Sequence, residues 1–181
     1  MNNMLFLSNN LVLRASTARH NIAYSVKRMM SSTLQEQCSE VLDFLIEEKN
    51  QYTQDDRVLI YVMSISVANY LSKFLNCQVL HRNVEDKESV LKKFRSSNSS
   101  VLVCTAVLSA GFDYHSVRAV IHFQSSYSII DFAQETGRAG RDNQLAKSIV
   151  FISSSSILST ERDSEEHKAF KLTYFAEKVC R

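Results

Sequence analysis

The residues best suited to chemistry lie in one short stretch, residues 134–142, which reads Gln-Glu-Thr-Gly-Arg-Ala-Gly-Arg-Asp. The chain has only three glycines, and two of them, Gly137 and Gly140, stand directly before Arg138 and Arg141. Glycine is needed where the backbone adopts a positive φ or approaches a ligand closely. Two guanidinium groups held by such backbone are suited to binding a small anion. The pattern therefore predicts a phosphate-handling site.

Strands and helices alternate in the pattern that surrounds this stretch. Short apolar runs predict buried strands, and longer segments with apolar residues at helical spacing predict helices. The expected strands are 22–26, 58–62, 79–80, 101–104, 119–123 and 148–152, and the expected helices are 34–48, 67–75, 84–94, 129–136 and 160–179. The alternation predicts an α/β fold with a mostly parallel sheet covered on both faces.

Two loops of this fold are expected to meet. In parallel sheets, ligands bind beyond the carboxyl ends of the strands. The loop 105–113, which contains the third glycine, Gly111, leaves the carboxyl end of one expected strand, and residues 134–142 close a helix. We therefore expect both regions to face one crevice.

The composition limits the classes of protein. With 181 residues, of which 45% are hydrophobic, the chain forms one globular domain, or one domain with short extensions. A net charge of +2 is too small to argue by itself for a nucleic-acid partner. No apolar run approaches the ~18 residues that span a bilayer, so we expect no membrane partner.

Two further features of the sequence bear on the cellular compartment of the protein. The four cysteines form no Cys-x-x-Cys pair, which argues against a complete zinc site and a secreted disulfide framework, and favours a reduced intracellular setting. The first 35 residues contain four basic residues and no Asp or Glu, a composition that resembles a mitochondrial transit peptide. An ordinary basic surface segment would have the same composition.

Several stretches, taken in their order along the chain, resemble the C-terminal RecA-like lobe of superfamily-2 helicases, specifically the RecQ type of DNA helicase. Residues 134–142 resemble motif VI in its RecQ form, residues 101–113 resemble motif V, and residues 59–64 resemble motif IV. Residues 14–24 resemble the segment that joins the two lobes, which makes the mitochondrial interpretation weaker and the nucleus the expected location. Tyr174-Phe175-Ala176 and Cys180 resemble the start of the RecQ zinc module.

The resemblance implies a division of the chain into three parts. Residues 1–30 would be the inter-lobe connecting segment, residues 31–153 the RecA-like, three-layer helicase domain, and residues 154–181 a linker and helix leading towards a truncated zinc module. A structural zinc site needs four ligands, and Cys180 would supply only the first, so we expect no zinc in this chain.

The resemblance also implies roles in phosphoryl transfer. A fixed guanidinium stabilises the charge that spreads over the γ-phosphoryl oxygens in the transition state. Arg138 and Arg141 match the motif VI arginines that reach across the cleft to ATP, and Arg141 is the expected arginine finger. Gln134 is expected to orient water or the γ-phosphate, and Gly137 and Gly140 to shape the backbone near the nucleotide.

Other matched positions concern the nucleotide and DNA. Asp113 matches a motif V carboxylate that contacts the ribose or the motif VI arginines. Thr105 matches the threonine that contacts a DNA phosphate through its hydroxyl and backbone, and Ser64 follows the motif IV strand, also expected at the DNA. Each residue alone has an ordinary explanation, such as a basic turn, a solvated carboxylate or a strand-end hydroxyl. RecQ proteins commonly carry His-Ala-Gly where this chain has residues 81–83, His-Arg-Asn, so the turn there and any DNA contact of its backbone can differ.

The elements that grip the nucleotide in this family do not occur in the sequence. The first lobe supplies a Gly-x-x-x-x-Gly-Lys-Ser/Thr phosphate loop and a strand-borne Asp-Glu pair for magnesium. None of the three glycines is followed by Lys, and no apolar strand precedes an Asp-Glu pair. We therefore expect ATP and Mg²⁺ to bind only together with a first RecA-like lobe, in cis or in trans.

The favoured interpretation is the second motor lobe of a RecQ-like 3′–5′ DNA helicase, as a fragment or a truncated protein. Its expected substrate is single-stranded or forked DNA, and we expect no ATP hydrolysis by the lobe alone. The alternatives are a non-enzymatic nucleic-acid-binding module, an RNA helicase lobe, and a decayed copy without function. The RNA helicase ranks lower because RNA helicases of the superfamily usually have Arg where this chain has Glu135.

Overall fold

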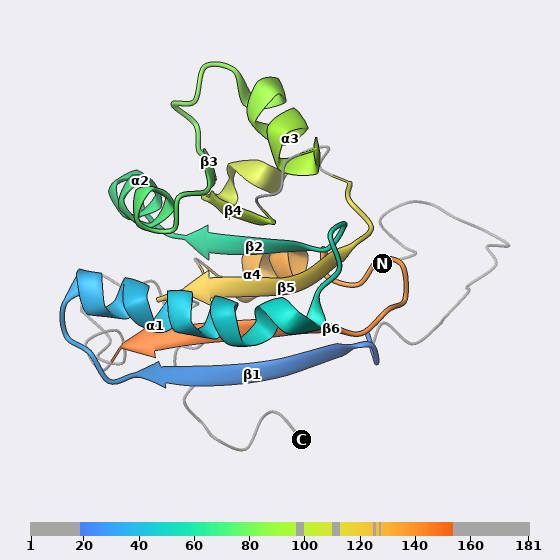
Figure 1. Cartoon of the computed structure of the whole chain (residues 1–181), viewed down its shortest axis with the longest axis horizontal. Coiled ribbons are helices and arrows are strands. Elements are labelled where there is room, and N and C mark those ends of the chain that lie inside the picture. Colours follow the sequence, from blue (N-terminus) through green and yellow to red (C-terminus); the bar gives the residue numbers. More distant parts are fainter. Residues whose placement is uncertain (1–18, 97–99, 110–112, 125, 127, 154–181) are drawn as a thin grey trace, which may run out of the picture.

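The fold is built on one six-stranded sheet in which every neighbouring pair of strands is parallel (Figure 1). The computed structural model of the chain describes residues 19–96, 100–109, 113–124, 126 and 128–153. The strands are β1 (Ile22–Met29), β2 (Arg57–Val62), β3 (Gln78–Leu80), β4 (Val101–Cys104), β5 (Val117–Phe123) and β6 (Ala146–Ser153), in the spatial order β1-β6-β5-β2-β4-β3. The helices are α1 (Leu34–Glu48), α2 (Ile65–Phe74), α3 (Lys87–Ser96) and α4 (Ile129–Thr136), with short 3₁₀ helices η2 (Lys49–Gln51) and η3 (Ala106–Ser109). The predicted α/β fold with a parallel sheet is confirmed.

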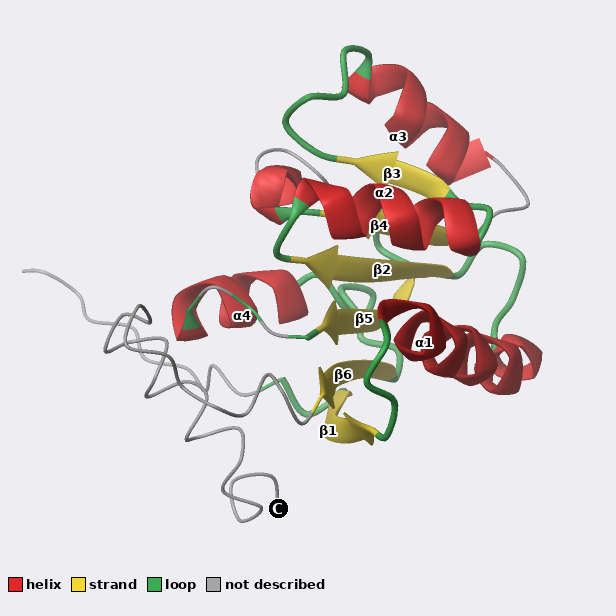
Figure 2. Ribbon diagram, turned by 90° about the vertical axis from the view of Figure 1, so that its left-hand side faces the viewer, coloured by secondary structure: helices red, strands yellow, loops and turns green. Residues whose placement is uncertain are grey.

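Helices cover both faces of the sheet, and the alternation of side chains along β2 shows how. Val58, Ile60 and Val62 pack in one apolar cluster with residues of α1 and α2. Leu59 and Tyr61 point to the other face, where the second cluster includes a residue of α3 and the turn after α4. Figure 2 shows α1 and α4 on opposite sides of the sheet. All six residues of β2 are buried, as expected for a strand covered on both faces.

Side-chain caps explain where the helices begin. Thr33 and Glu36 form a reciprocal capping box at the start of α1, which begins where the sequence predicts. The Ser64 hydroxyl accepts a hydrogen bond from the Val67 amide, so α2 begins at Ile65, two residues earlier than predicted. Asp86 accepts from the Ser89 amide, and α3 accordingly begins at Lys87 rather than at residue 84.

The outer strands are longer than their apolar runs indicate. β1 and β6 pair over eight residues each, from Ile22 opposite Ala146 to Met29 opposite Ser153. β1 is an edge strand with six exposed residues, so its sequence carries only a weak strand pattern. It lies within the part assigned from sequence to the connecting segment, and that division stays a prediction. The expected helix 160–179, Cys180 and residues 14–18 lie outside the described residues.

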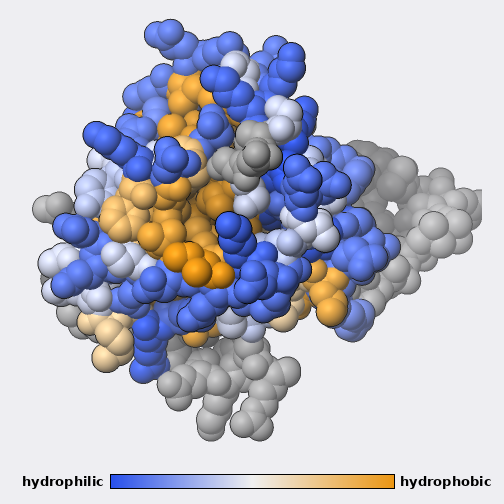
Figure 3. Space-filling model, viewed as in Figure 1, coloured by the Kyte–Doolittle hydropathy of each residue, from blue (hydrophilic) through white to orange (hydrophobic). Residues whose placement is uncertain are grey.

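An apolar hollow lies between α1 and the residues that follow the C-terminal end of α2 (Figure 3). It has a volume of about 560 Å³ and reaches Val58, the second residue of β2, and Val101, the first residue of β4. These are the amino ends of the strands. None of the residues predicted for the phosphate-handling site lines this hollow. Among the described residues, no helix has the length and apolar character needed to cross a membrane.

A largely buried arginine joins three segments at the amino edge of the sheet. Arg118 on β5 donates to Asp56, before β2, at 2.7 Å, and also to Asp142, after α4. Burial raises the pKa of both carboxyl groups, but hydrogen bonds from the Thr53 amide and Arg118 to Asp56, and from Arg118 to Asp142, outweigh it and hold both pKa values below the ordinary range.

The ion pairs of Arg118 with Asp56 and Asp142 predict that the stability of the fold is sensitive to acid. Carboxyl groups with lowered pKa values in the folded state stabilise the fold above the unfolded pKa, and this stabilisation is lost as the pH falls below about 4. Arg118→Gln should lower the free energy of unfolding by about 3 kcal/mol at pH 7, because it leaves a buried carboxylate unpaired. The deficit should shrink as the pH falls from 6 to 3. Urea unfolding across that range measures both effects.

The exposed pair of Lys27 and Glu47 supplies the matched control. Lys27→Gln should change stability by less than about 0.5 kcal/mol at any pH. If the loss of unfolding free energy in Arg118→Gln stays constant with pH, the two carboxylates do not stabilise the fold through Arg118.

Candidate functional site

The turn after α4 requires glycine at one of its two positions. Gly140 has a φ of +56°, and a β-carbon there would lie 2.5 Å from Nδ2 of Asn21 and 2.7 Å from the carbonyl oxygen of Gln144. Gly137 caps α4 with an ordinary right-handed φ of −60°. A β-carbon there would meet only the Ala133 carbonyl at 3.1 Å and the Gln134 carbonyl at 3.5 Å. The positive φ predicted for this stretch therefore occurs at Gly140.

The segment before β1 fixes this turn through side-chain donors. Nη2 of Arg19 donates to the carbonyl oxygens of Ala139 and Gly140, both at 2.9 Å. Nδ2 of Asn21 donates to the Gly140 carbonyl at 2.8 Å and to that of Gln144 at 2.9 Å. From the other side, the Gly140 amide donates to Val117 of β5. The sequence analysis placed Arg19 and Asn21 in the joining segment without a role, because nothing local to them reveals a partner about 120 residues away.

The turn sends its two arginines in different directions. Arg141 reaches outward, where its Nη1 donates to Oδ1 of Asp113 at 2.5 Å. This hydrogen bond is the main reason that the pKa of Asp113 lies below its ordinary value. The loop after β4 and the turn after α4 therefore meet, as expected. They meet beside the amino ends of β5 and β6, because Asp113 lies four residues before β5 and the Gly140 amide donates to Val117, so the expectation that both lie beyond the carboxyl ends is wrong for this pair. Both side chains of the pair are solvent-accessible, 36% for Arg141 and 61% for Asp113, so the guanidinium is held in place but can exchange its partner.

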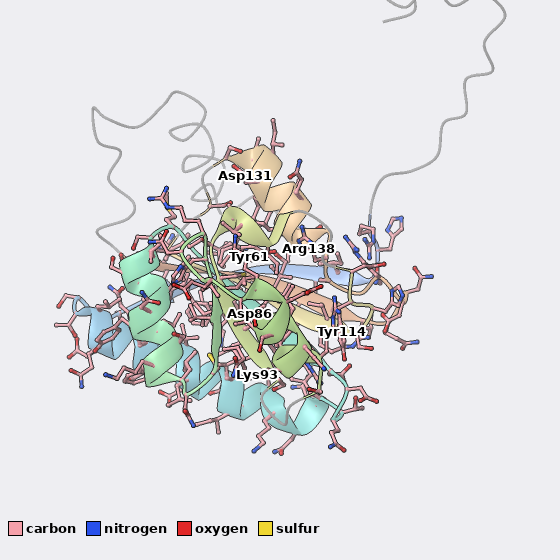
Figure 4. All side chains as sticks on the ribbon, turned by 90° about the horizontal axis from the view of Figure 1, so that it is seen from above. Tyr61, Asp86, Lys93, Tyr114, Asp131 and Arg138 are labelled. Atoms are coloured by element: carbon pink, nitrogen blue, oxygen red, sulfur yellow. The ribbon has the colours of Figure 1, made fainter. Side chains whose placement is uncertain are left out.

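Arg138 instead lies against the sheet and is only 7% exposed. Its guanidinium is close to the Tyr61 hydroxyl on β2 (Figure 4). Burial raises the pKa of Tyr61 well above its ordinary value, and the nearby charge of Arg138 opposes that rise. The two arginines thus differ: Arg141 is presented at the surface, while Arg138 is packed under the turn.

Gln134 and Glu135 also point to different environments. Gln134 is exposed on α4, where it can reach a ligand. Glu135 is buried, and its Oε2 lies 3.0 Å from Nε2 of His122 on β5 and accepts a hydrogen bond of 3.0 Å from the Ser126 hydroxyl. The sequence alone predicts no role for His122. A histidine inside the apolar run 117–123 is the signal that could have revealed a buried polar partner.

The two residues expected at DNA lie at the carboxyl ends of their strands. Thr105 follows β4 and is buried, and its amide donates to the Leu80 carbonyl at 3.1 Å. A contact of that amide with a phosphate would require this hydrogen bond to break. Ser64 follows β2, and its hydroxyl caps α2 and lies 3.1 Å from that of Ser66. Their contact with nucleic acid stays a prediction.

The turn after β3 closes without the glycine of the RecQ pattern. His81 is buried, and its Nε2 lies 2.9 Å from Oδ1 of Asn69 on α2. The Asn83 amide donates to Nδ1 of the same ring, and the Val84 amide to the His81 carbonyl. No residue from 81 to 84 has a positive φ, so the sequence His-Arg-Asn is compatible with this turn.

The geometry offers cationic and amide groups for an anion, and the described residues contain no cluster of three or more His, Cys, Asp or Glu side chains that could hold a metal ion. Residues 36–143, more than half of the chain, match the family described as "Helicase conserved C-terminal domain". The chain belongs to this family. It is the C-terminal domain of a superfamily-2 helicase.

Named relatives of this helicase domain divide between two classes. The chain is 29% identical over 144 residues to ATP-dependent DNA helicase Q1 of Pongo abelii, covering 76% of this chain and 21% of the relative. It is 37% identical over 82 residues to ATP-dependent DNA helicase RecQ of Pasteurella multocida, covering 44% and 13%. It is also 32% identical over 101 residues to probable ATP-dependent RNA helicase DDX52 of Bos taurus, covering 52% and 17%. The chain thus spans about a fifth or less of the length of these relatives.

Solved structures support the fold of the helicase domain. Domain 2 of the DEAD-box helicase Mss116p bound to an RNA duplex has a TM-score of 0.61 and 16% identity, covering 74% of this chain and 55% of that chain. The E. coli DEAD-box protein SrmB, bound to regulator of ribonuclease activity A, has a TM-score of 0.59 and 18% identity, covering 74% and 77%. At these identities the similarity establishes the shared architecture alone.

The two glycines of the helicase motif should respond very differently to alanine. Gly140→Ala should lower the free energy of unfolding by about 2 kcal/mol or more, because it combines a positive φ with two close contacts. Gly137→Ala, its matched control, should cost less than about 1 kcal/mol, since only a single contact of 3.1 Å tightens. Equilibrium unfolding of both variants measures the difference. Equal losses would show that the turn does not depend on the left-handed backbone at Gly140.

Proposed function

We propose that this domain is the second motor lobe of a RecQ-like 3′–5′ DNA helicase and that it acts with a first RecA-like lobe. The observation that carries the proposal is the setting of Glu135. Its carboxylate is buried against His122 and Ser126 in the middle of the motif. The motif resembles its RecQ form, whereas RNA helicases of the superfamily usually carry Arg at this position. An arginine there would place a cation beside the buried His122 ring without the carboxylate that now accepts its hydrogen bond.

The extent of similarity gives further support. The alignment to DNA helicase Q1 covers 76% of this chain, against 52% for the RNA helicase DDX52. The higher identity of DDX52 over its shorter span, 32% against 29%, keeps an RNA helicase lobe as the second candidate.

In the proposed reaction, the domain contributes one side of the nucleotide site. ATP supplies the phosphoryl group whose charge must be stabilised, and the groups that grip it and its Mg²⁺ would come from the first lobe. Arg141, held by Asp113 at the surface, is placed to exchange that carboxylate for phosphate oxygens. Asp113 keeps the guanidinium oriented until the lobes meet, and the exposed Gln134 lies on α4, earlier in the same motif. Arg138, packed on Tyr61, adds positive charge beneath the turn.

The arginine role predicts the kinetics of a two-lobe protein. We expect the chain fused behind the first lobe of Pasteurella multocida RecQ to hydrolyse ATP when single-stranded DNA is added. Arg141→Ala should lower kcat by about 10³-fold or more, the effect typical of an arginine finger. Arg141→Lys should restore little, because an ammonium does not reproduce the planar fork.

Controls separate the catalytic role from folding. Asp113→Asn should leave the fold intact, since the pair is exposed, and should lower kcat much less than Arg141→Ala. The lobe alone should show no ATP hydrolysis. A fusion that hydrolyses ATP equally well with and without Arg141 would contradict the assignment of the finger.

The choice of nucleic acid is tested by binding to the unfused chain. We expect fluorescently labelled single-stranded DNA to bind at least as tightly as RNA of the same sequence, with an affinity that falls as salt rises, because phosphate contacts release counterions. Ser64→Ala and Thr105→Val should each weaken binding to DNA. Clear preference for RNA at every salt concentration would replace the RecQ-like assignment with the RNA helicase alternative, and absence of binding to both would favour a decayed copy.

A further inference from the structure

One histidine of the sheet is completely enclosed and is not used by the proposed reaction. The side chain of His122 is 0% exposed. Its ring stacks on Tyr61 of β2 with centroids 5.7 Å apart and an interplanar angle of 18°, and it packs against Phe132 of α4 at 4.8 Å. Among the residues that the structure describes, Nδ1 has no hydrogen-bond partner, and the one polar contact of the ring is from Nε2 to Glu135. A buried polar ring with a single bond has its orientation set by that bond.

The bond matters because Glu135 has a cationic neighbour in the same motif, Arg138. The Arg138 amide donates to the Glu135 carbonyl, so the backbone continues to turn after α4 ends and the two side chains emerge on neighbouring positions. Both charges act on the buried Tyr61 hydroxyl and Cys104 thiol, which places them in the same enclosed region. In such surroundings, a carboxylate that loses its donors pairs with the nearest cation, because an unpaired buried charge is costly.

His122 and Ser126 direct the carboxylate elsewhere. Both contacts are to Oε2 of Glu135, and they come from β5 and from the loop that follows it. The carboxylate is thereby held on the β5 side, while the Arg138 guanidinium lies by Tyr61 on the neighbouring strand β2. The carboxylate and the guanidinium, on residues three positions apart, therefore lie beside different strands.

We propose that His122 is a positioning residue, which holds the Glu135 carboxylate on β5 and so prevents it from capturing the guanidinium of Arg138. Without His122, Glu135 swings to Arg138, and the guanidinium leaves its place beside Tyr61. The arrangement of side chains belongs to the lobe itself, and only its consequence for ATP hydrolysis rests on the proposed function.

The first test observes Arg138 directly in the full, unfused chain. The Nε–H resonance of Arg138 in an ¹H–¹⁵N spectrum reports the environment of its guanidinium. His122→Ala should move this resonance downfield in the proton dimension, because a carboxylate forms a short, charge-assisted bond with the group. The double variant His122→Ala/Glu135→Gln should return it towards the wild-type position, since a neutral amide has no charge to pair with Arg138.

His81→Ala is the matched control. It removes another buried histidine, whose ring bonds to a helix side chain outside the motif, Asn69 of α2. It should destabilise the protein and leave the Arg138 resonance unmoved. If His122→Ala does not fold, Ser126→Ala removes only one of the two donors and should produce a smaller shift in the same direction. An Arg138 resonance that stays in place in the folded His122 or Ser126 variant overturns the proposal.

The second test measures kcat of the two-lobe fusion described above. His122→Ala should lower kcat by about tenfold or more with a small change in KM, and the added Glu135→Gln should recover most of the loss. A purely structural role predicts no recovery, because the second substitution removes a further buried contact. The spectrum needs no ATPase activity, so an inactive fusion with the expected shifts would contradict the proposed function alone, and an active fusion without them would contradict the role of His122 alone.

Discussion

The left-handed backbone at Gly140 is the constraint on which the site depends. It lets the chain reverse directly after α4 in a space that has no room for a β-carbon. The reversal brings consecutive carbonyl groups to Arg19 and Asn21 and the Gly140 amide to Val117. Because the turn is held from both sides, Arg138 is directed to the sheet and Arg141 to the surface. Without these contacts from other segments, nothing would hold the two guanidinium groups in different directions, and both would extend into solvent.

Charged groups elsewhere in the domain are likewise tied to partners from other elements. Arg118 of β5 links carboxylates that lie before β2 and after α4. Glu135 is tied to β5, and Lys147 of β6 reaches Glu48 at the end of α1 at 2.5 Å. These links are expensive to break, since removing one partner leaves a charge in a poorly solvated place. They therefore fix the relative positions of the elements that carry the motif.

The proposed half of a nucleotide site has a form suited to completion by a second lobe. Arg141 is bound to Asp113 at the surface, while Arg138 is already packed beneath it. An exposed ion pair costs little to exchange, so a stronger anion can replace Asp113 without disturbing the fold. The membership of the helicase C-terminal family explains why such a half site exists, because the motor of these proteins is divided between two lobes.

The sequence by itself determined the elements and the family. The apolar runs of β2 and β4 and the helical spacing of α1 and α4 are local properties, so their positions could be predicted closely. The order of glycines and arginines in residues 134–142 could likewise be read directly.

Only the tertiary structure decided which partners these residues have. Nothing in the sequence places Arg19 at a turn 120 residues away, pairs the exposed strand β1 with β6, or separates a buried Arg138 from a surface Arg141. Likewise, His122 reads as one polar residue in an apolar strand until the helix above it supplies Glu135. Secondary structure follows from interactions within a few residues, whereas the burial and pairing of charges depend on segments that the sheet brings together.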